Sequence, residues 1–242
     1  MKTPTTDIAA ASARWRRDPC TFVEEVLVNY ETDKPFILYG EEKVFLRRAL
    51  TLDKNGRLPY PEMIFSAPKK SGKTCFGALC VIYVAVVLAG NYGEVYCLAN
   101  DFEQASSRVF QAASRIIQAS PRLRGGVIIT QKQIVFKSTG TFIQACASDA
   151  TGFAGGNPNL TVCDELWGFT SESSRRLFDE ALPSPARKVS GRLVVTYAGF
   201  SGESDLLESL FKRGMAGKVI GKDLRATNDG MLCYWTNRVC AP

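Results

Sequence analysis

A polar loop between an apolar, strand-like run and a long apolar, helix-like run constrains the fold of this chain most. The loop lies in IFSAPKKSGKTCFGALC, residues 64–80, where Gly72, Lys73 and Thr74 directly precede the second apolar run. This ending matches the phosphate-binding signature G-x-x-x-x-G-K-[ST], although Ala67 stands where the signature has its first glycine. A strand, such a loop and a helix predict an anion site built from backbone N–H groups and a helix N-terminus. The alternative is a chance G-K-T at the start of a helix, which the flanking elements disfavour.

The residues of this loop would have separate tasks in a nucleotide site. Gly72 lets the backbone approach a phosphate, Lys73 places a positive charge near the β- and γ-phosphates, and Thr74 offers a hydroxyl ligand to Mg²⁺. The segment expected to bind the nucleotide comprises Ala67, Pro68, Lys70, Ser71, Gly72, Lys73, Thr74 and Cys75. The sequence therefore predicts ATP and Mg²⁺ as the bound groups.

Two adjacent acids follow a later apolar run, NLTVCDE, residues 159–165. Asp164, at the end of this predicted strand, can hold the magnesium ion directly or through water. Glu165 can act as the general base that polarises the attacking water, which favours hydrolysis over transfer to an acceptor. A surface loop with two acids is the alternative, and the lysine-bearing loop upstream disfavours it. Trp167, just after the acids, is expected to pack in the core rather than to brace Glu165.

Strands and helices alternate along most of the chain, which predicts an α/β domain with a mainly parallel sheet. We expect residues 1–60 to form a helical lead-in packed on the core and residues 61–230 the core. Residues 231–242 are assigned to the start of a linker, with a further strand as the alternative. Asp101 is expected to cap the helix that follows the second strand of the core. Because ligands bind beyond the carboxyl ends of parallel strands, the lysine loop and the two acids should share one edge of the sheet.

The composition disfavours several other kinds of site. The chain of 242 residues contains no histidine, and its eight cysteines form no C-x-x-C pair, so zinc sites and histidine catalysis are disfavoured. The longest apolar run, residues 75–89, is too short to span a bilayer, so we expect no membrane partner. A net charge of +6 permits a polyanionic partner without requiring one. The basic residues Arg14, Arg16 and Arg17 are interpreted as a solvated helix face.

Three motifs, SAPKKSGKT, NPNLTVCDELWGF and VVTYAG, together resemble the ATPase domain of tailed-bacteriophage large terminases. The resemblance extends over about residues 35–220 and includes the order, spacing and flanking residues of the motifs. It implies a three-layer αβα P-loop NTPase fold of the ASCE, or RecA-like, class. It also implies an ATP-driven motor that moves double-stranded DNA into a procapsid.

The resemblance further implies roles for single residues. In that family the first residue of the loop need not be glycine, and Lys69 takes the position of the family's basic loop residue, which contacts the γ-phosphate. Thr196, in VVTYAG, takes the position of the motif that couples hydrolysis to movement. By its residue type alone, Thr196 could contact the γ-phosphate region or belong to an ordinary strand exit. Tyr39 is carried over as the adenine-stacking residue, in a lead-in that lacks the family's glutamine.

The resemblance also implies partners. Large terminases work as a ring, usually of five subunits, on the portal and with a small terminase subunit, in the cytoplasm of the host cell. Ring ATPases often place an arginine at a neighbour's γ-phosphate; the stretch before the acidic strand has none, and we select Arg213 from the candidates Arg122, Arg124 and Arg213. The isolated chain is expected to be a monomer. No nuclease activity is expected, because the chain ends before the family's nuclease domain.

Two other functions stay open on the sequence alone. One is a helicase-like ATPase stimulated by nucleic acid, which the lack of helicase motifs after TYAG disfavours. The other is a non-catalytic nucleotide-binding module that assembles capsid machinery. A Glu165→Ala variant that binds ATP without turning it over would favour the enzyme.

Overall fold

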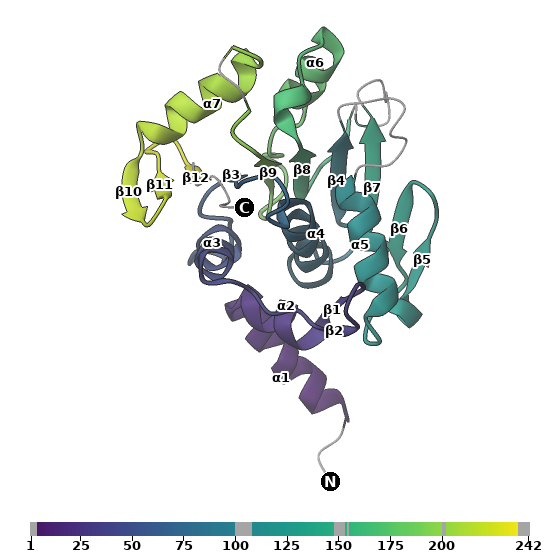
Figure 1. The fold of residues 1–242 in the computed structure, drawn as a ribbon. Coiled ribbons are helices and arrows are strands. Elements are labelled where there is room, and N and C mark those ends of the chain that lie inside the picture. The colour runs from purple at the N-terminus through teal and green to yellow at the C-terminus, as the bar shows by residue number, and fades with distance from the viewer. Residues whose placement is uncertain (1–3, 100–107, 148–152, 154, 200–201, 237–242) are drawn as a thin grey trace.

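The computed structural model describes residues 4–99, 108–147, 153, 155–199 and 202–236. Within these residues, a ten-stranded sheet forms the centre of the molecule (Figure 1). Its strands are, in spatial order, β10 (Lys218–Gly221), β11 (Leu224–Ala226), β12 (Met231–Trp235), β3 (Glu62–Ser66), β9 (Gly191–Thr196), β8 (Leu160–Asp164), β4 (Glu94–Ala99), β7 (Phe142–Ala147), β6 (Gln133–Phe136) and β5 (Val127–Ile129). The stretch from β12 to β7 is parallel, and antiparallel strands extend it on both sides.

Helices cover both faces of the sheet. One face carries α1 (Pro4–Arg17), α2 (Pro19–Val26), α3 (Gly40–Leu50), α4 (Lys73–Tyr83) and α5 (Arg108–Ala119), and the other carries α6 (Glu172–Glu180) and α7 (Asp205–Met215). The central strand β9 shows why, since Leu193 and Val195 join the hydrophobic core of the first face and Val194 that of the second. All residues of β8 and β9 are buried, as expected for parallel strands covered on both sides. The predicted three-layer α/β fold with a mainly parallel sheet is confirmed.

Helix α4 is fixed tightly between its neighbours. A Cβ atom at Gly77 would lie 3.3 Å from side-chain carbons of both Val109 in α5 and Val195 in β9, so this helix approaches helix and sheet closely. After Tyr83 the helix continues as a π-helical segment, Val84–Leu88. The lead-in packs on α4 through Phe22, whose ring centroid lies 5.6 Å from that of Tyr83. A small antiparallel pair, β1 (Val28–Asn29) and β2 (Lys34–Pro35), joins α2 to α3.

The carboxyl-terminal part of the chain differs from the sequence-based expectation. Residues 231–235, assigned above to the start of a linker, form β12 and pair in parallel with β3. All five residues of this strand are buried, so their side chains belong to the core. The predicted helix cap Asp101 lies outside the described residues.

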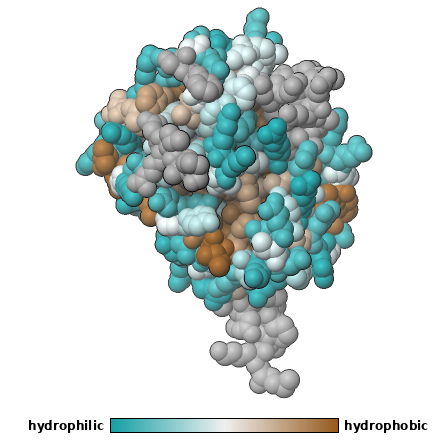
Figure 2. All heavy atoms as spheres, in the orientation of Figure 1, coloured by the Kyte–Doolittle hydropathy of each residue, from teal (hydrophilic) through white to brown (hydrophobic). Residues whose placement is uncertain are grey.

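Hydrophilic residues cover most of the face seen in Figure 2. Apolar patches at its left and right edges lie over the outer strands β10 and β5, where Val219 is 60% and Ile128 53% exposed. Both outer strands are short, which limits pairing with the edge of another sheet. Within the described residues, none of the helices combines the length and the apolar character needed to cross a bilayer.

Candidate active site

The loop between β3 and α4 combines a strand continuation with a left-handed turn. The Ala67 N–H donates to the Thr196 carbonyl at 3.1 Å, so Ala67 still belongs to the β3–β9 ladder. The backbone needs no positive φ at Ala67, which explains why the loop can begin without glycine. Gly72, the residue before α4, has φ 84° and ψ 6°, a conformation that favours glycine. Lys70 is also left-handed, at φ 64°, and such turns form anion-binding concavities.

The two polar clusters predicted to share one edge of the sheet meet there. Lys73 Nζ lies 3.1 Å from Glu165 Oε1. Thr74 Oγ1 donates to Asp164 Oδ1 at 3.5 Å. Lys73 and Asp164 are only 5% and 6% exposed, so their charges interact where little water screens them. The geometry therefore places a cation, a hydroxyl and two carboxylates around one point beside the loop.

Glu165 is held in an unusual backbone conformation. Its φ of 53° and ψ of 54° are left-handed, which is uncommon for a residue with a Cβ atom. Trp167 follows in a short 3₁₀ turn, Leu166–Gly168, and its indole Nε1 donates to Glu165 Oε2 at 2.8 Å. Trp167 thus braces Glu165, the alternative that the sequence disfavoured, and it also packs against the core of the second face.

Tyr197 is a site residue that the sequence analysis missed. Lys69 Nζ lies 4.4 Å and Lys73 Nζ 5.4 Å from the centroid of the Tyr197 ring. The same ring lies 5.5 Å from that of Trp167. The parallel register pairs Ser66 with Thr196, so the residue after Thr196 must lie beside the start of the loop. An aromatic residue directly after the strand that pairs with β3 was therefore the available signal.

Burial changes the acidity of Asp164. Desolvation raises the pKa of this carboxyl from 3.8 to about 7, and the neighbouring charge of Glu165 acts in the same direction. The positive charges of Lys73 and Arg108 and the hydrogen bond from Thr74 oppose this shift. Arg108, at the start of the described part of α5, was not singled out from the sequence. A cation bound beside Asp164 would favour its ionised form.

The stability of the metal-free protein should depend on pH through Asp164. Between about pH 4 and about pH 7 the folded protein keeps a proton that the unfolded chain has lost, so the free energy of unfolding falls as the pH rises. The change is at most about 4 kcal/mol, since one pKa unit corresponds to about 1.4 kcal/mol. Urea denaturation in a chelating buffer measures it. An Asp164→Asn variant should lose this part of the pH dependence, and identical pH profiles for both proteins would contradict the assignment.

The other residues of the predicted loop differ in how far they are exposed to solvent. Lys69, Lys70 and Ser71 are exposed, and Pro68 is half-buried. The side chain of Cys75 is half-buried, and burial raises the pKa of its thiol to about 12, so the thiol stays protonated. Within the described residues all cysteines are free, and all except Cys75 are buried.

Tyr39 lies toward the end of β3 that leads into the lysine-bearing loop, and Arg213 lies at the other end of this strand. Tyr39 is 72% exposed and precedes α3, whose Glu42 lies close enough to Cys75 for its charge to raise the pKa of that thiol. The start of α3 is therefore near the start of α4. Arg213 instead forms ion pairs with Glu62 and with Asp229, the latter at 2.7 Å. Because Glu62 begins β3, Arg213 lies at the end of this strand opposite to the loop that joins β3 to α4.

Thr196 is fully buried and ties strand to loop. Its carbonyl accepts the Ala67 N–H, and its hydroxyl donates to the Tyr197 carbonyl at 3.0 Å. A shift of Thr196 would therefore also displace Ala67, at the start of the loop, through this hydrogen bond. Its coupling role stays a prediction.

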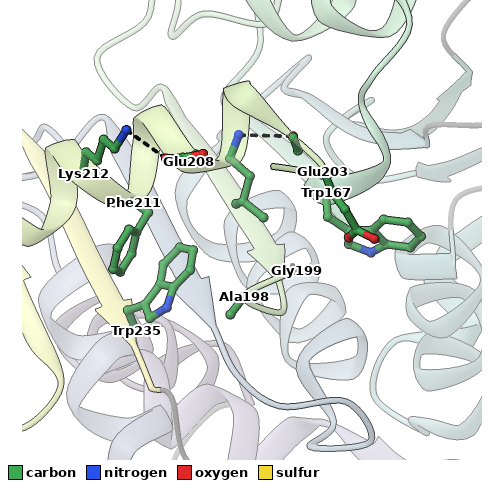
Figure 3. Close-up of a pocket in the computed structure, with 10 residues that line it drawn as sticks. Trp167, Ala198, Gly199, Glu203, Glu208, Phe211, Lys212 and Trp235 are labelled. Atoms are coloured by element: carbon green, nitrogen blue, oxygen red, sulfur yellow. Dashed lines mark hydrogen bonds and ion pairs between the residues drawn. The ribbon is translucent and has the colours of Figure 1, made fainter. Parts of the chain in front are cut away.

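A pocket of about 240 Å³ lies behind Trp167 (Figure 3). It is bounded by α7, by Ala198 and Gly199 after β9, and by Trp235 at the end of β12. Figure 3 shows Trp167 at one end of this space and the rings of Phe211 and Trp235 at the other. The centroids of the Phe211 and Trp235 rings are 4.8 Å apart. Lys73, Thr74 and Asp164 do not line it, so it is separate from the contacts at the start of α4.

Comparison with known proteins agrees with this arrangement. Residues 57–212 match the family model described as "Terminase large subunit, ATPase domain". Among solved structures, the chain is similar to the HK97 bacteriophage large terminase, with 19% sequence identity and a TM-score of 0.69 over 89% of this chain and 42% of that chain. The chain thus spans less than half the length of that protein.

A second solved structure is the ATPase domain of the large terminase of Thermus phage P74-26. It shares 11% sequence identity with this chain, and the match extends over 81% of this chain and 79% of that domain at a TM-score of 0.47. The assignment of a P-loop NTPase fold rests on the HK97 comparison. A search of curated proteins gave no match.

Proposed function

The chain belongs to the family of terminase large subunit ATPase domains, and on this premise we propose that it hydrolyses ATP with Mg²⁺ to move double-stranded DNA into a procapsid. The observation that carries the proposal is the meeting of Lys73 with Glu165 at 3.1 Å, next to the contact of Thr74 with Asp164 at 3.5 Å. These four groups are the ones with which a phosphate-binding loop and its acidic strand contact a nucleoside triphosphate.

Thr74 and Asp164 fit a magnesium site in this proposal. Both offer oxygen atoms, the ligands that Mg²⁺ prefers, and two protein ligands leave room for the phosphates and water that usually complete its shell. If magnesium binds here, Thr74 and Asp164 would hold it, and it would supply positive charge that offsets the charge of the phosphates. The buried Asp164 is poised for this task because a cation at its side would offset the burial that now raises its pKa.

Lys73 and Glu165 have linked roles in the proposed reaction. Without nucleotide they neutralise each other, and an arriving triphosphate competes for the lysine with a higher negative charge. Glu165 is then free to accept a proton from the attacking water, while the indole of Trp167 keeps its carboxylate in place. Lys69, exposed and resting on the Tyr197 ring, can turn to the γ-phosphate. Tyr39 is proposed to stack on adenine.

The proposed partners follow from the family. They are double-stranded DNA, the portal, a small terminase subunit and further copies of this chain in a ring, which we propose to be a pentamer in the cytoplasm of the host cell. An arginine from a neighbouring subunit would complete the site. Arg213 can serve only if its ion pairs with Glu62 and Asp229 open, so its role as that arginine is a prediction that its contacts disfavour.

Steady-state ATP hydrolysis by the purified chain tests the proposal. We expect phosphate release that depends on Mg²⁺ and falls at least about 100-fold in a chelating buffer, since the metal supplies several kcal/mol of charge stabilisation. Manganese should restore it, because it also takes oxygen ligands. A chain that binds ATP without releasing phosphate in any of these buffers would instead be a non-catalytic nucleotide-binding module.

A further inference from the structure

A basic groove lies at the amino ends of the parallel strands, away from the proposed ATP site. Its volume is about 800 Å³. Three of the segments that line it carry its cations: the end of α1 with Arg16 and Arg17, the turn with Lys54, and the approach to β9 with Arg187 and Lys188. The sequence alone predicts a solvated helix face for the first of these segments. The fold instead places its two arginines beside the other three cations.

The charge of this groove is largely uncompensated. Within the described part of the chain, Arg16, Arg17, Lys54 and Lys188 form no ion pair. The acid that lines the groove, Asp53, accepts hydrogen bonds from the backbone N–H groups of residues 55 and 57, at 2.8 and 2.9 Å. Four unpaired cations around one hollow repel one another, and an anion in the groove would relieve that repulsion.

The groove is built on anchored elements. The Tyr83 hydroxyl donates to the Trp15 carbonyl at 3.0 Å, which fixes the end of α1 on α4. Arg187 is held by Glu94 at 3.1 Å and by the Asn157 carbonyl at 2.9 Å, which fixes the segment that carries Lys188. Four of the five cations, Arg16, Arg17, Arg187 and Lys188, therefore project from segments that other contacts hold in place.

We propose that this groove holds the phosphate backbone of double-stranded DNA, an inference that rests on the packaging function proposed above. A polyphosphate strand fits better than an acidic protein surface because the larger apolar residues of the groove offer no exposed anchor: Leu88 and Val189 are buried, and Leu52 is half-buried. Protein interfaces depend on such buried apolar anchors, whereas phosphate contacts need only cations. Contacts of this kind are blind to base sequence, as a motor that moves along DNA requires.

The position of the groove allows DNA and ATP to bind together. The helix that begins at Lys73 ends, through its π-helical segment, at Leu88 in the groove wall. At 1.5 Å per residue this helix separates the two sites by about 22 Å. It also connects them through one continuous element.

The test is binding of short labelled duplexes of several sequences to the full chain, measured by fluorescence anisotropy between about 50 and about 200 mM salt. We expect Lys54→Glu with Lys188→Glu to weaken binding at least about tenfold for every duplex. The slope of log affinity against log salt should fall by about 2 if each lysine neutralises one phosphate. The matched control is Lys218→Glu with Lys222→Glu, on the exposed β10–β11 hairpin, which should leave affinity and slope unchanged.

Equal binding by the native chain and the groove variant would overturn the proposal. Binding to polyglutamate that the groove variant loses, with duplex binding unaffected, would also overturn it and would assign the groove to an acidic protein. Basal ATP hydrolysis, measured in parallel, distinguishes a failure of the groove proposal from a failure of the proposed function. It should be the same in the groove variant and the native chain, and its absence from the native chain would refute the proposed function whatever the duplexes do.

Discussion

A Glu165→Gln variant should bind ATP but lose its turnover. The amide cannot take a proton from water, and a general base typically contributes about 10²- to 10⁴-fold to the rate, so kcat should fall by that factor. Binding should be kept or become tighter, because Lys73 no longer has the carboxylate at 3.1 Å as a competing partner. Phosphate release gives kcat, and titration with a fluorescent ATP analogue gives Kd.

Two features make this substitution informative. Gln has nearly the shape of Glu, and its carbonyl oxygen can still accept the hydrogen bond from Trp167, so the left-handed turn should persist. Glu208→Gln, a change of a half-buried residue in an ion pair with Lys212 on α7, is the matched control and should keep the native rate. A near-native kcat for Glu165→Gln would remove Glu165 from the role of base. Loss of both binding and turnover would make it a structural residue.

A Lys73→Ala variant should lose ATP binding. Lys73 is 5% exposed at the start of α4, and removing one partner of a buried charge contact costs about 2–5 kcal/mol. At about 1.4 kcal/mol per tenfold change, a loss of 3 kcal/mol or more means at least about 100-fold weaker binding. Isothermal titration with ATP and Mg²⁺ measures it, with Lys212→Ala as a control that keeps the native affinity.

The Lys73→Ala variant must also be shown to fold. Its loss of charge leaves Asp164 and Glu165 without their nearest cation, which raises the pKa of Asp164 further. Circular dichroism and thermal unfolding distinguish a folded protein that cannot bind from an unfolded one. Tight ATP binding by the folded variant would refute the assignment of the loop.

The fold class could be predicted because the sequence patterns that indicate it are local. The change from apolar strand to polar loop to apolar helix occurs within residues 62–88, and the same alternation recurs down the chain. The position of β12 was not predictable, because MLCYW is five apolar residues that suit a strand or a linker equally. Its partner β3 lies more than 160 residues earlier, and pairing over that separation depends on the packed core rather than on local pattern.

The candidate site was partly predictable for a similar reason. The convergence of Lys73 with Asp164 and Glu165 follows from parallel strands that end at the same edge of the sheet. The contacts of Trp167 with Glu165 and of Tyr197 with Lys69 depend on where side chains point after the strands end. The cations of the basic groove come from three separate segments that only the folded chain brings together.

The most direct test of the account is a structure of the chain with Mg²⁺ and a non-hydrolysable ATP analogue. We predict that Lys73 leaves Glu165 for the terminal phosphate, that Thr74 and Asp164 lie around the metal, and that Trp167 still holds Glu165. The opposite result is a bound nucleotide that leaves the 3.1 Å contact of Lys73 with Glu165 intact, or that lies away from residues 67–75. Either observation would contradict the claim that these groups act on one triphosphate.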